Sequence, residues 1–333
     1  MKFIVINLRK YFFTIVFSLF AILLFLFSES SLNATKSGLE LWIVKIFPSL
    51  FPFFIATELL LKTNIASILG KVFTPIMKPI FNVPGEASIA LILGNISGYP
   101  IGAKVVCNLK KNKLISPIEA ERLIAYTNNS SPFFILTTIG FLMFKDKKIG
   151  QILLISHILS SILVGICFRF WKYNYSNAYT SKLLKSNSST SLIKFSNIGE
   201  ILSESIKNAF FSSISIGGFI ILFSIILEML NLTGVIEFFS HIASLFNIPS
   251  NVSKCILSSL IEFTNGINLI CNLNTINLNL KIILTSFVLG FSGMSILLQV
   301  YSIISKENIS IKPYFYGKIL QSIFSCIIIS LLI

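Results

Sequence analysis

The sequence predicts an all-α polytopic membrane protein with about seven transmembrane helices and two re-entrant helical hairpins. Of its 333 residues, 54% are hydrophobic and only 12% are charged, whereas a soluble domain carries about 25% charged residues. Several apolar runs reach the ~20 residues needed to cross a hydrocarbon layer of about 30 Å. Two further apolar regions are interrupted near their middle by turn-forming residues. The alternating ~10-residue segments of a membrane β-barrel are not seen.

The first apolar run follows Lys2, Arg9 and Lys10 and resembles a signal peptide. Its core, residues 11–27, is longer than the usual ~7–15 residues of a signal sequence. We therefore expect an uncleaved first helix and a following loop within residues 1–37. The other predicted spans are residues 39–61, 117–144, 149–171, 203–230, 281–304 and 313–333.

Residues 85–112 and 250–276 are apolar but do not suit single spans. "SGYPIG" interrupts the first and "FTNGIN" the second, and each half, roughly 18 Å as a helix, is too short to cross. Two such halves predict a re-entrant hairpin, whose non-helical tip is tolerated only inside protein or beside a wet cavity. Residues 64–84 and 233–249, ahead of the hairpins, are expected to form amphipathic helices at the interface.

The two halves of the chain carry the same features in the same order. An offset of 165 residues places "FNVP" at residues 81–84 over "FNIP" at residues 246–249, and also aligns the hairpin breaks. We expect a first repeat over residues 38–171, a polar cytoplasmic linker over residues 172–199 and a second repeat over residues 200–333. With three full spans in each repeat, the second is inverted, as in many secondary transporters.

Positive charges indicate the orientation. With a cytoplasmic N-terminus, only seven of the 27 Lys and Arg residues fall outside, in agreement with the positive-inside rule. These seven are Lys36, Lys45, Lys145, Lys147, Lys148, Lys254 and Lys281. The net charge of +14 is thus ascribed to topology and not to nucleic-acid binding. The abundance of Ile, Asn, Lys and Phe is typical of an AT-rich bacterial genome, so a bacterial cell membrane is the expected location.

Polar residues at four breaks are the candidates for solute binding. Unwound segments free backbone amides and carbonyls, and half-helix N-termini carry a partial positive charge. A single polar notch would favour the simpler role of joining helices by hydrogen bonds, but four in register favour a binding site. The candidates are Ser97, Gly98, Tyr99 and Pro100 at the first hairpin tip, Asn128, Asn129, Ser130 and Ser131 in the third span, Glu262, Thr264, Asn265 and Gly266 in the second hairpin, and Ser292, Gly293 and Ser295 in the sixth span.

Two charged residues belong to this prediction. A carboxylate near the bilayer midplane costs at least ~2.5–3.5 kcal/mol, so Glu262 must be partnered, hydrated or protonated. It is a candidate for coupling to a proton or cation, or for contacting the solute; the alternative is a shallower hairpin that leaves it in water. Lys104, shortly after the first tip, is a candidate for balancing an anion.

No pattern in the sequence indicates an enzyme, a metal site or a cofactor. Pairs of His, Cys or acids lack metal-ligand spacing, no phosphate loop or nucleophile–base pair is present, and the single Asp, Asp146, falls in a predicted loop. The five cysteines are scattered and are expected to pack as small apolar side chains.

Several stretches of the first half resemble a known family: "GLELWIVKIFPSLFPFFIATELL", "FNVPGE", "SGYPIGAK" and "IEAERLIAYTNNSSPFF". They resemble the sporulation integral membrane protein YlbJ family, also called SpoVV, within the wider group of membrane proteins with nucleoside-recognition Gate segments. The resemblance is close over residues 38–171 and loose beyond them. It implies a fold like that of concentrative nucleoside transporters, which hold solute at hairpins and unwound helices.

The resemblance also implies a function. The family is associated with endospore formation, including spore cortex and core maturation, and with moving dipicolinate out of the mother cell across the outer forespore membrane. Free amides at helix N-termini suit such a planar dianion. The family motifs fall on residues 97–100 and 128–131 of this chain. Related Gate proteins suggest a homo-oligomer.

The leading hypothesis is therefore a transporter or facilitator for a small organic anion, with dipicolinate as the expected solute. A transporter of nucleosides or another metabolite with the same fold is one alternative. A non-transporting membrane scaffold for spore assembly is the other. The expected partners are the anionic solute, the lipid bilayer, a coupling proton or cation and further copies of the chain, without cofactor or nucleic acid.

Overall fold

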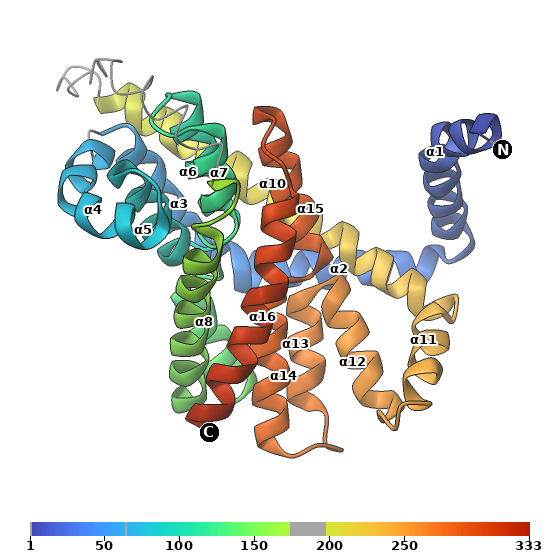
Figure 1. The fold of residues 1–333 in the computed structure, drawn as a ribbon. Helices are drawn as coiled ribbons and strands as arrows, with labels where there is room; N and C mark the ends of the chain where they lie inside the picture. Colours follow the sequence, from blue (N-terminus) through green and yellow to red (C-terminus); the bar gives the residue numbers. More distant parts are fainter. Residues whose placement is uncertain (1, 64, 174–197) are drawn as a thin grey trace.

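The computed structural model describes residues 2–63, 65–173 and 198–333, and this part of the chain is helical without any strand (Figure 1). The predicted all-α class is confirmed. In chain order the elements are α1 (Lys2–Leu26), α2 (Ser28–Glu40), η1 (Leu41–Ile46), α3 (Phe47–Leu61), α4 (Ile65–Phe81), η2 (Gly85–Ala87), α5 (Ser88–Ile96), α6 (Ile101–Lys111), α7 (Pro117–Ile124), η3 (Phe134–Met143), α8 (Lys147–Phe168), α10 (Ile198–Leu232), α11 (Val235–Ser244), α12 (Ser250–Ile261), α13 (Phe263–Asn272), α14 (Leu278–Phe291), α15 (Gly293–Ile304), η5 (Ser305–Glu307) and α16 (Lys312–Leu332).

Among the described residues, four helical segments are long and apolar enough to cross a membrane: α8, α10, the segment Leu278–Glu307 and α16. Two bent pairs raise the number to six if each counts as one span. They are Tyr11–Leu26 with Ser28–Val44, bent by 100°, and Ser67–Phe81 with Gly85–Ile96, bent by 92°. These segments indicate a multi-pass membrane protein, but the predicted count of seven spans is not confirmed.

Two predicted stretches differ from the structure, and a third agrees with it. Residues 39–61 are divided among the end of α2, the π-helical η1 and the 15-residue α3. Residues 117–144 form α7 and the π-helical η3 with a non-helical stretch between them, at the polar notch where the break was predicted. Residues 28–37 were expected to be a loop but are helical, because this polar stretch contains no proline and packs along α10. Most of the predicted linker, residues 174–197, lies outside the described residues.

The elements of the two halves follow one another in the same order. The first half has α4, the hairpin α5–α6, the interrupted pair α7 and η3, and α8; the second has α11, the hairpin α12–α13, the interrupted pair α14 and α15, and α16. The helices α4 and α11 fall where interfacial helices were predicted. In Figure 1, α6 and α7 lie in the upper part of the view and α12 to α14 in the lower part. An inverted relation between the halves stays a prediction.

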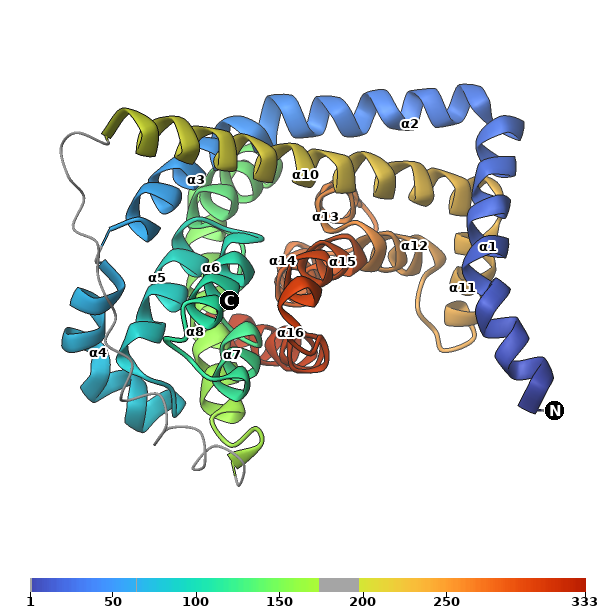
Figure 2. The ribbon, with the colours of Figure 1, turned by 90° about the horizontal axis from the view of Figure 1, so that it is seen from above.

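The longest helix, α10, has 35 residues. At 1.5 Å per residue it is about 50 Å long, so it must tilt within a membrane or project from it. Figure 2 shows α2 and α10 side by side along one flank of the molecule, and α3 also packs on α10.

On the side away from this flank, α8, α14 and α16 pack closely together. Ser156 of α8 donates a hydrogen bond to the carbonyl of Ser325 in α16 (2.9 Å), and its hydroxyl lies 3.2 Å from that of Ser286 in α14. A Cβ atom on Gly290 would lie 2.6 Å from the Cα of Ser322. Small residues of this kind let membrane helices approach each other closely. Their packing fixes the position of α16 beside the first broken span.

Candidate functional site

The first hairpin turns through the non-helical residues 97–100 between α5 and α6. Gly98 has a φ of +82°, which favours glycine, and a Cβ atom there would lie 3.0 Å from the Cβ of Ser131. The hydroxyls of Ser97 and Thr57 are 2.8 Å apart and hydrogen-bonded. The tip is therefore held between α3 and the first broken span.

Two glycines bring this hairpin against the broken span. A Cβ atom on Gly94 or Gly102 would lie 1.7 or 2.1 Å from the carbonyl oxygen of Thr127, so neither position has room for a side chain. Asn128 Oδ1 accepts a hydrogen bond from the backbone N–H of Ala103 at 3.3 Å. Hairpin and broken span thus form one packed unit.

The break between α7 and η3 leaves residues 128–131 without regular structure, and their side chains are buried. Pro132 begins the following helix, where its missing N–H costs no hydrogen bond. Ser131 Oγ accepts a hydrogen bond from the backbone N–H of Phe134 at 3.2 Å. The backbone N–H of Ser130 donates to Nε2 of His157 at 3.2 Å. The broken segment is thus held in place by side chains and not by a helical ladder.

Asn129 occupies the centre of a buried polar network. Its Nδ2 donates to the carbonyl of Tyr126 at 2.7 Å and to Oδ1 of Asn95 at 3.0 Å. Its Oδ1 accepts from Lys318 Nζ at 3.2 Å and from Gln321 Nε2 at 2.9 Å. The network joins the first hairpin, the first broken span and α16.

The second hairpin breaks at Glu262 alone, and not across "FTNGIN" as predicted, since residues 263–272 form α13. The carboxylate of Glu262 accepts hydrogen bonds from the backbone N–H groups of Thr264 (3.1 Å) and Asn265 (2.7 Å). The side chain therefore caps α13, which explains why the helix begins directly after it. Glu262 is fully buried and forms no ion pair with any described residue.

The other candidates of the second hairpin have different surroundings. Thr264 and Asn265 line an open hollow of about 190 Å³ together with Ser37 of α2. Gly266 packs on α12, where an added Cβ would lie 2.2 Å from the Cα of Ser259. Its role is therefore close packing of the two hairpin helices.

The second interrupted span breaks only at Ser292. Ser292 and Gly293 have positive φ angles of 72° and 74°, which end α14 and start α15. Ser295 is buried one turn further along α15.

Tyr99 connects the breaks of the two halves. Its hydroxyl shares a hydrogen bond with the hydroxyl of Ser292. Its ring packs edge-on against that of Phe263, with centroids 6.1 Å apart, and Phe263 lies 5.8 Å from the ring of Phe134. The structure thus brings both hairpin breaks and both interrupted spans into one buried region. Solute binding there stays a prediction.

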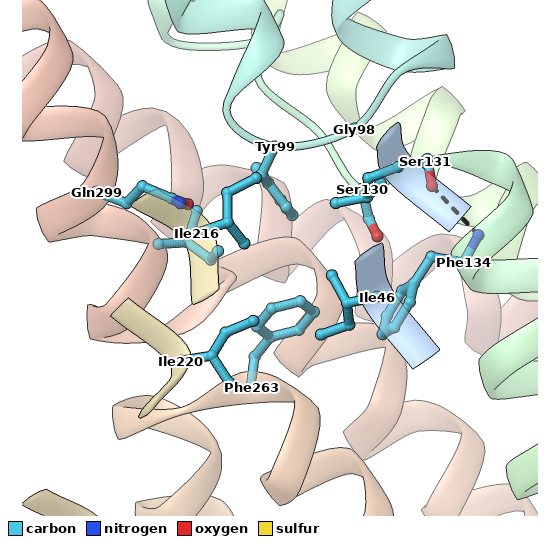
Figure 3. A pocket seen from close by; sticks show the side chains of 12 residues that line it. Ile46, Gly98, Tyr99, Ser130, Ser131, Phe134, Ile216, Ile220, Phe263 and Gln299 are labelled. Carbon is cyan, nitrogen blue, oxygen red and sulfur yellow. Dashed lines mark hydrogen bonds between the residues drawn. The ribbon is translucent and has the colours of Figure 1, made fainter. Parts of the chain in front are cut away.

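A small cavity lies in this region (Figure 3). Its volume is about 40 Å³, room for a few water molecules at most. In Figure 3, Tyr99, Gln299 and Ser130 lie on its upper side and Phe263 on its lower side. Its lining consists of Ile46, Leu50, Gly98, Tyr99, Ser130, Ser131, Phe134, Ile216, Ile220, Phe263, Ile296 and Gln299. Gly98, Tyr99, Ser130 and Ser131 were predicted as site residues, and the other predicted residues do not line this cavity.

Gln299 was not predicted as a site residue. Its side chain is 1% exposed, and neither its amide oxygen nor its amide nitrogen has a hydrogen-bond partner in the described residues. A buried polar group without a partner costs free energy, so a ligand or water that supplies one is favoured. A single amide within the apolar run "ILLQVY" was the sequence signal that could have identified it.

Lys318 was also missed. Its side chain is 1% exposed; besides Asn129, its Nζ donates to Gln321 Oε1 at 2.8 Å, and it lies 5.2 Å from the ring centroid of Tyr99 and 5.6 Å from that of Tyr314. A lysine near the start of an apolar span normally extends its amine to the membrane interface, so the sequence did not indicate Lys318 as a site residue. The spacing of Lys318 and Gln321, three residues apart on one helix face, was the available signal.

Lys104, the predicted anion-balancing residue, has a partner in the protein. Its Nζ forms an ion pair with Glu58 of α3 and donates to Ser212 of α10 at 3.0 Å. Its charge is therefore balanced by a carboxylate, and it does not line the cavity.

Two comparisons relate the chain to known proteins. Residues 43–145 match the family model Gate, described as nucleoside recognition; this range contains the first hairpin and the first broken span. Over 318 residues the chain is 34% identical to the sporulation integral membrane protein YlbJ of Bacillus subtilis (strain 168), an alignment that covers 91% of this chain and 78% of that relative. No solved structure matches the chain significantly.

Proposed function

Because the chain belongs to the family of the sporulation integral membrane protein YlbJ, we propose that it is a membrane transporter or facilitator for a small organic anion, dipicolinate, during endospore formation. Nothing in the family match points to an enzyme. The proposal places the N-terminus in the cytoplasm and the protein in the outer forespore membrane, with the two halves inverted as in concentrative nucleoside transporters.

One observation supports a transporter above other roles. The hairpin breaks at residues 97–100 and at Glu262 come from segments far apart in the sequence, yet Tyr99 contacts both Phe263 and Ser292. Secondary transporters hold their solutes at this kind of junction of interrupted helices between two repeats. A scaffold has no need to bury polar breaks at the cost of helical hydrogen bonds.

The size of the cavity has a consequence for transport. Sites for small molecules are usually about 300–1,000 Å³, whereas this cavity has about 40 Å³. We infer that the transport cycle includes a wider conformation, reached by moving the hairpins apart around Tyr99. Coupling to a proton or cation through Glu262 and assembly as a homo-oligomer belong to the proposal as further expectations.

A nucleoside transporter is the second candidate. The family model that matches residues 43–145 carries the description nucleoside recognition. The aromatic rings of Tyr99, Phe134 and Phe263 around the cavity would suit a nucleobase as well as a pyridine ring.

Uptake into vesicles tests the proposal. Purified protein is reconstituted into liposomes that contain trapped terbium, which luminesces when dipicolinate chelates it. Liposomes with the wild-type protein should admit dipicolinate faster than protein-free liposomes that contain the same trapped terbium. Ser130→Ala, whose side chain lines the cavity, should reduce the initial rate about 10-fold, whereas Ser330→Ala, at an exposed position of α16, should leave it unchanged.

The outcomes separate the candidates. Folded wild type that admits no dipicolinate overturns the substrate, and uptake of labelled uridine in the same vesicles would then support the nucleoside alternative. Uptake of dipicolinate that is the same in wild type, Ser130→Ala, Asn128→Ala and Glu262→Gln would contradict the site. Absence of uptake of either solute would favour the scaffold.

A further inference from the structure

Lys318 places a side-chain amine inside the helix bundle with no carboxylate of the described residues beside it. Within the described part of the chain it forms no ion pair, although five other pairs are present. Its hydrogen-bond acceptors, Asn129 Oδ1 and Gln321 Oε1, are neutral amides. A charge buried in a membrane protein is costly unless it is paired, and such residues generally mark a solute or ion pathway.

The neighbours of Lys318 are arranged for a cation. The rings of Tyr99 and Tyr314 lie within 5.6 Å of its Nζ, a distance suited to cation–π interaction. Lys318 Nζ donates two hydrogen bonds, which leaves one of its three ammonium N–H donors without an acceptor among the described residues. Lys318 therefore has the capacity to bind one more acceptor.

Tyr99 is the link between Lys318 and the cavity. The ring that Lys318 contacts is also part of the cavity lining, opposite Phe263. Gln299, whose amide has no partner, lines the same cavity. A movement of one ring would thus join a cation, a free amide and several aromatic side chains in one site.

We propose that Lys318 is the residue that binds a carboxylate group of the solute, with Gln299 binding a second polar group and Tyr99 separating Lys318 from the cavity until solute enters. The ligand class is a planar aromatic carboxylate, because the amide of Gln299 and the rings of Phe134 and Phe263 line a mostly apolar space, and Lys318 lies against the Tyr99 ring that completes this lining. This inference rests on the proposed function. It assigns to Lys318 the charge-recognition role that the sequence suggested for Lys104, since Glu58 already balances Lys104.

Equilibrium binding to purified protein in nanodiscs tests the inference with three probes: dipicolinate, isophthalate and the neutral pyridine-2,6-dicarboxamide. Wild type should bind the two dianions at least about 10-fold more tightly than the diamide. Lys318→Met should weaken binding of the dianions about 30-fold or more, the usual cost of losing one partner of a buried charge pair, and should leave binding of the diamide nearly unchanged. Lys318→Arg, which keeps the charge, should retain part of the preference.

Lys312→Met is the matched control, because Lys312 lies on the same helix and is exposed. If Lys318→Met does not fold, the inference is still tested by the preference of wild type for the dianions over the diamide and by the binding of the dianions to Lys318→Arg. The inference is overturned if wild type binds dipicolinate and the diamide equally well, or if wild type and Lys318→Met bind the dianions equally well. Either result leaves the proposed substrate intact. Binding of isophthalate but not dipicolinate, with dependence on Lys318, supports the inference and overturns the substrate. Binding of no probe overturns both.

Discussion

At the scale of single residues, Glu262 illustrates how a buried acid is accommodated. Both of its carboxylate oxygens accept backbone N–H groups at the start of α13. The N-terminus of a helix carries a partial positive charge that favours an anion at this place. The sequence identified Glu262 as an acid that needs a partner. The partner is the first turn of its own hairpin helix, a role compatible with a further one in coupling.

The capping role predicts a graded effect on stability. Glu262→Ala should lower the free energy of unfolding by about 1–2 kcal/mol, because two backbone donors lose their acceptor, whereas Glu262→Asp should retain most of the stability because Asp is a favourable N-cap residue. Thermal unfolding in detergent measures the difference. Glu200→Ala, at an exposed position of α10, should have a much smaller effect. Equal melting temperatures for Glu262→Ala and wild type would contradict the cap.

At the scale of elements, the first hairpin depends on close contact with the broken span. Gly94 and Gly102, on α5 and α6, both approach the carbonyl oxygen of Thr127. The hairpin helices are short, so they gain their stability from this packing and not from their own length. Larger residues at these two positions would hold the hairpin further from the broken span, and would hold Tyr99 further from Phe263 and Ser292.

Gly102→Ala should therefore destabilise the protein by about 1–3 kcal/mol, the usual range for overpacking, because its Cβ would lie 2.1 Å from Thr127 O. Gly218→Ala is the matched control: Gly218 lies in α10 with nothing within 4 Å of an added Cβ. That change should be neutral or stabilise by up to about 1 kcal/mol. The melting temperatures of the two variants measure these effects. A Gly102→Ala protein that is as stable as wild type, with unaltered uptake, would contradict the close contact between Gly102 and Thr127.

At the scale of the whole molecule, the question is how the two halves lie in the membrane. In Figure 1 the helices α5 and α6 of the first hairpin lie in the upper half of the view, whereas α13 of the second hairpin lies in the lower half. The order of elements, repeated in each half, and the distribution of Lys and Arg favour opposite orientations. The exposed apolar residues of α1, α8 and α10 suit contact with lipid.

Labelling with a membrane-impermeant maleimide tests this orientation in intact cells, with the five native cysteines replaced. Thr275→Cys, in the exposed turn after α13, should be labelled from outside. Lys111→Cys, at the exposed end of α6, should be labelled only after permeabilisation. Labelling of both from the same side would exclude inverted halves.

Much of the fold followed from local sequence signals. "SGYPIG" predicted the first hairpin tip, and residues 97–100 are non-helical; "TNNSSP" predicted the first broken span, and residues 128–131 are irregular. In the second half the break lies at Glu262 and not within "FTNGIN" as predicted. The Glu262 carboxylate caps α13, and the residues "FTNGIN" form the first part of that helix. The candidate site was anticipated at Tyr99 and Ser130 but not at Gln299 or Lys318.

The sequence by itself determined the helical class and the places where helices break, since glycine, proline and capping side chains act within one turn of the residues they affect. Tertiary structure alone decided which breaks meet and which charges are paired. Lys104 and Lys318 both lie in helices near breaks, but the first meets Glu58 and the second meets Tyr99 and Asn129. Burial and charge pairing depend on atoms contributed by distant segments, and only the packing of α16 against the first hairpin and broken span brings those atoms together.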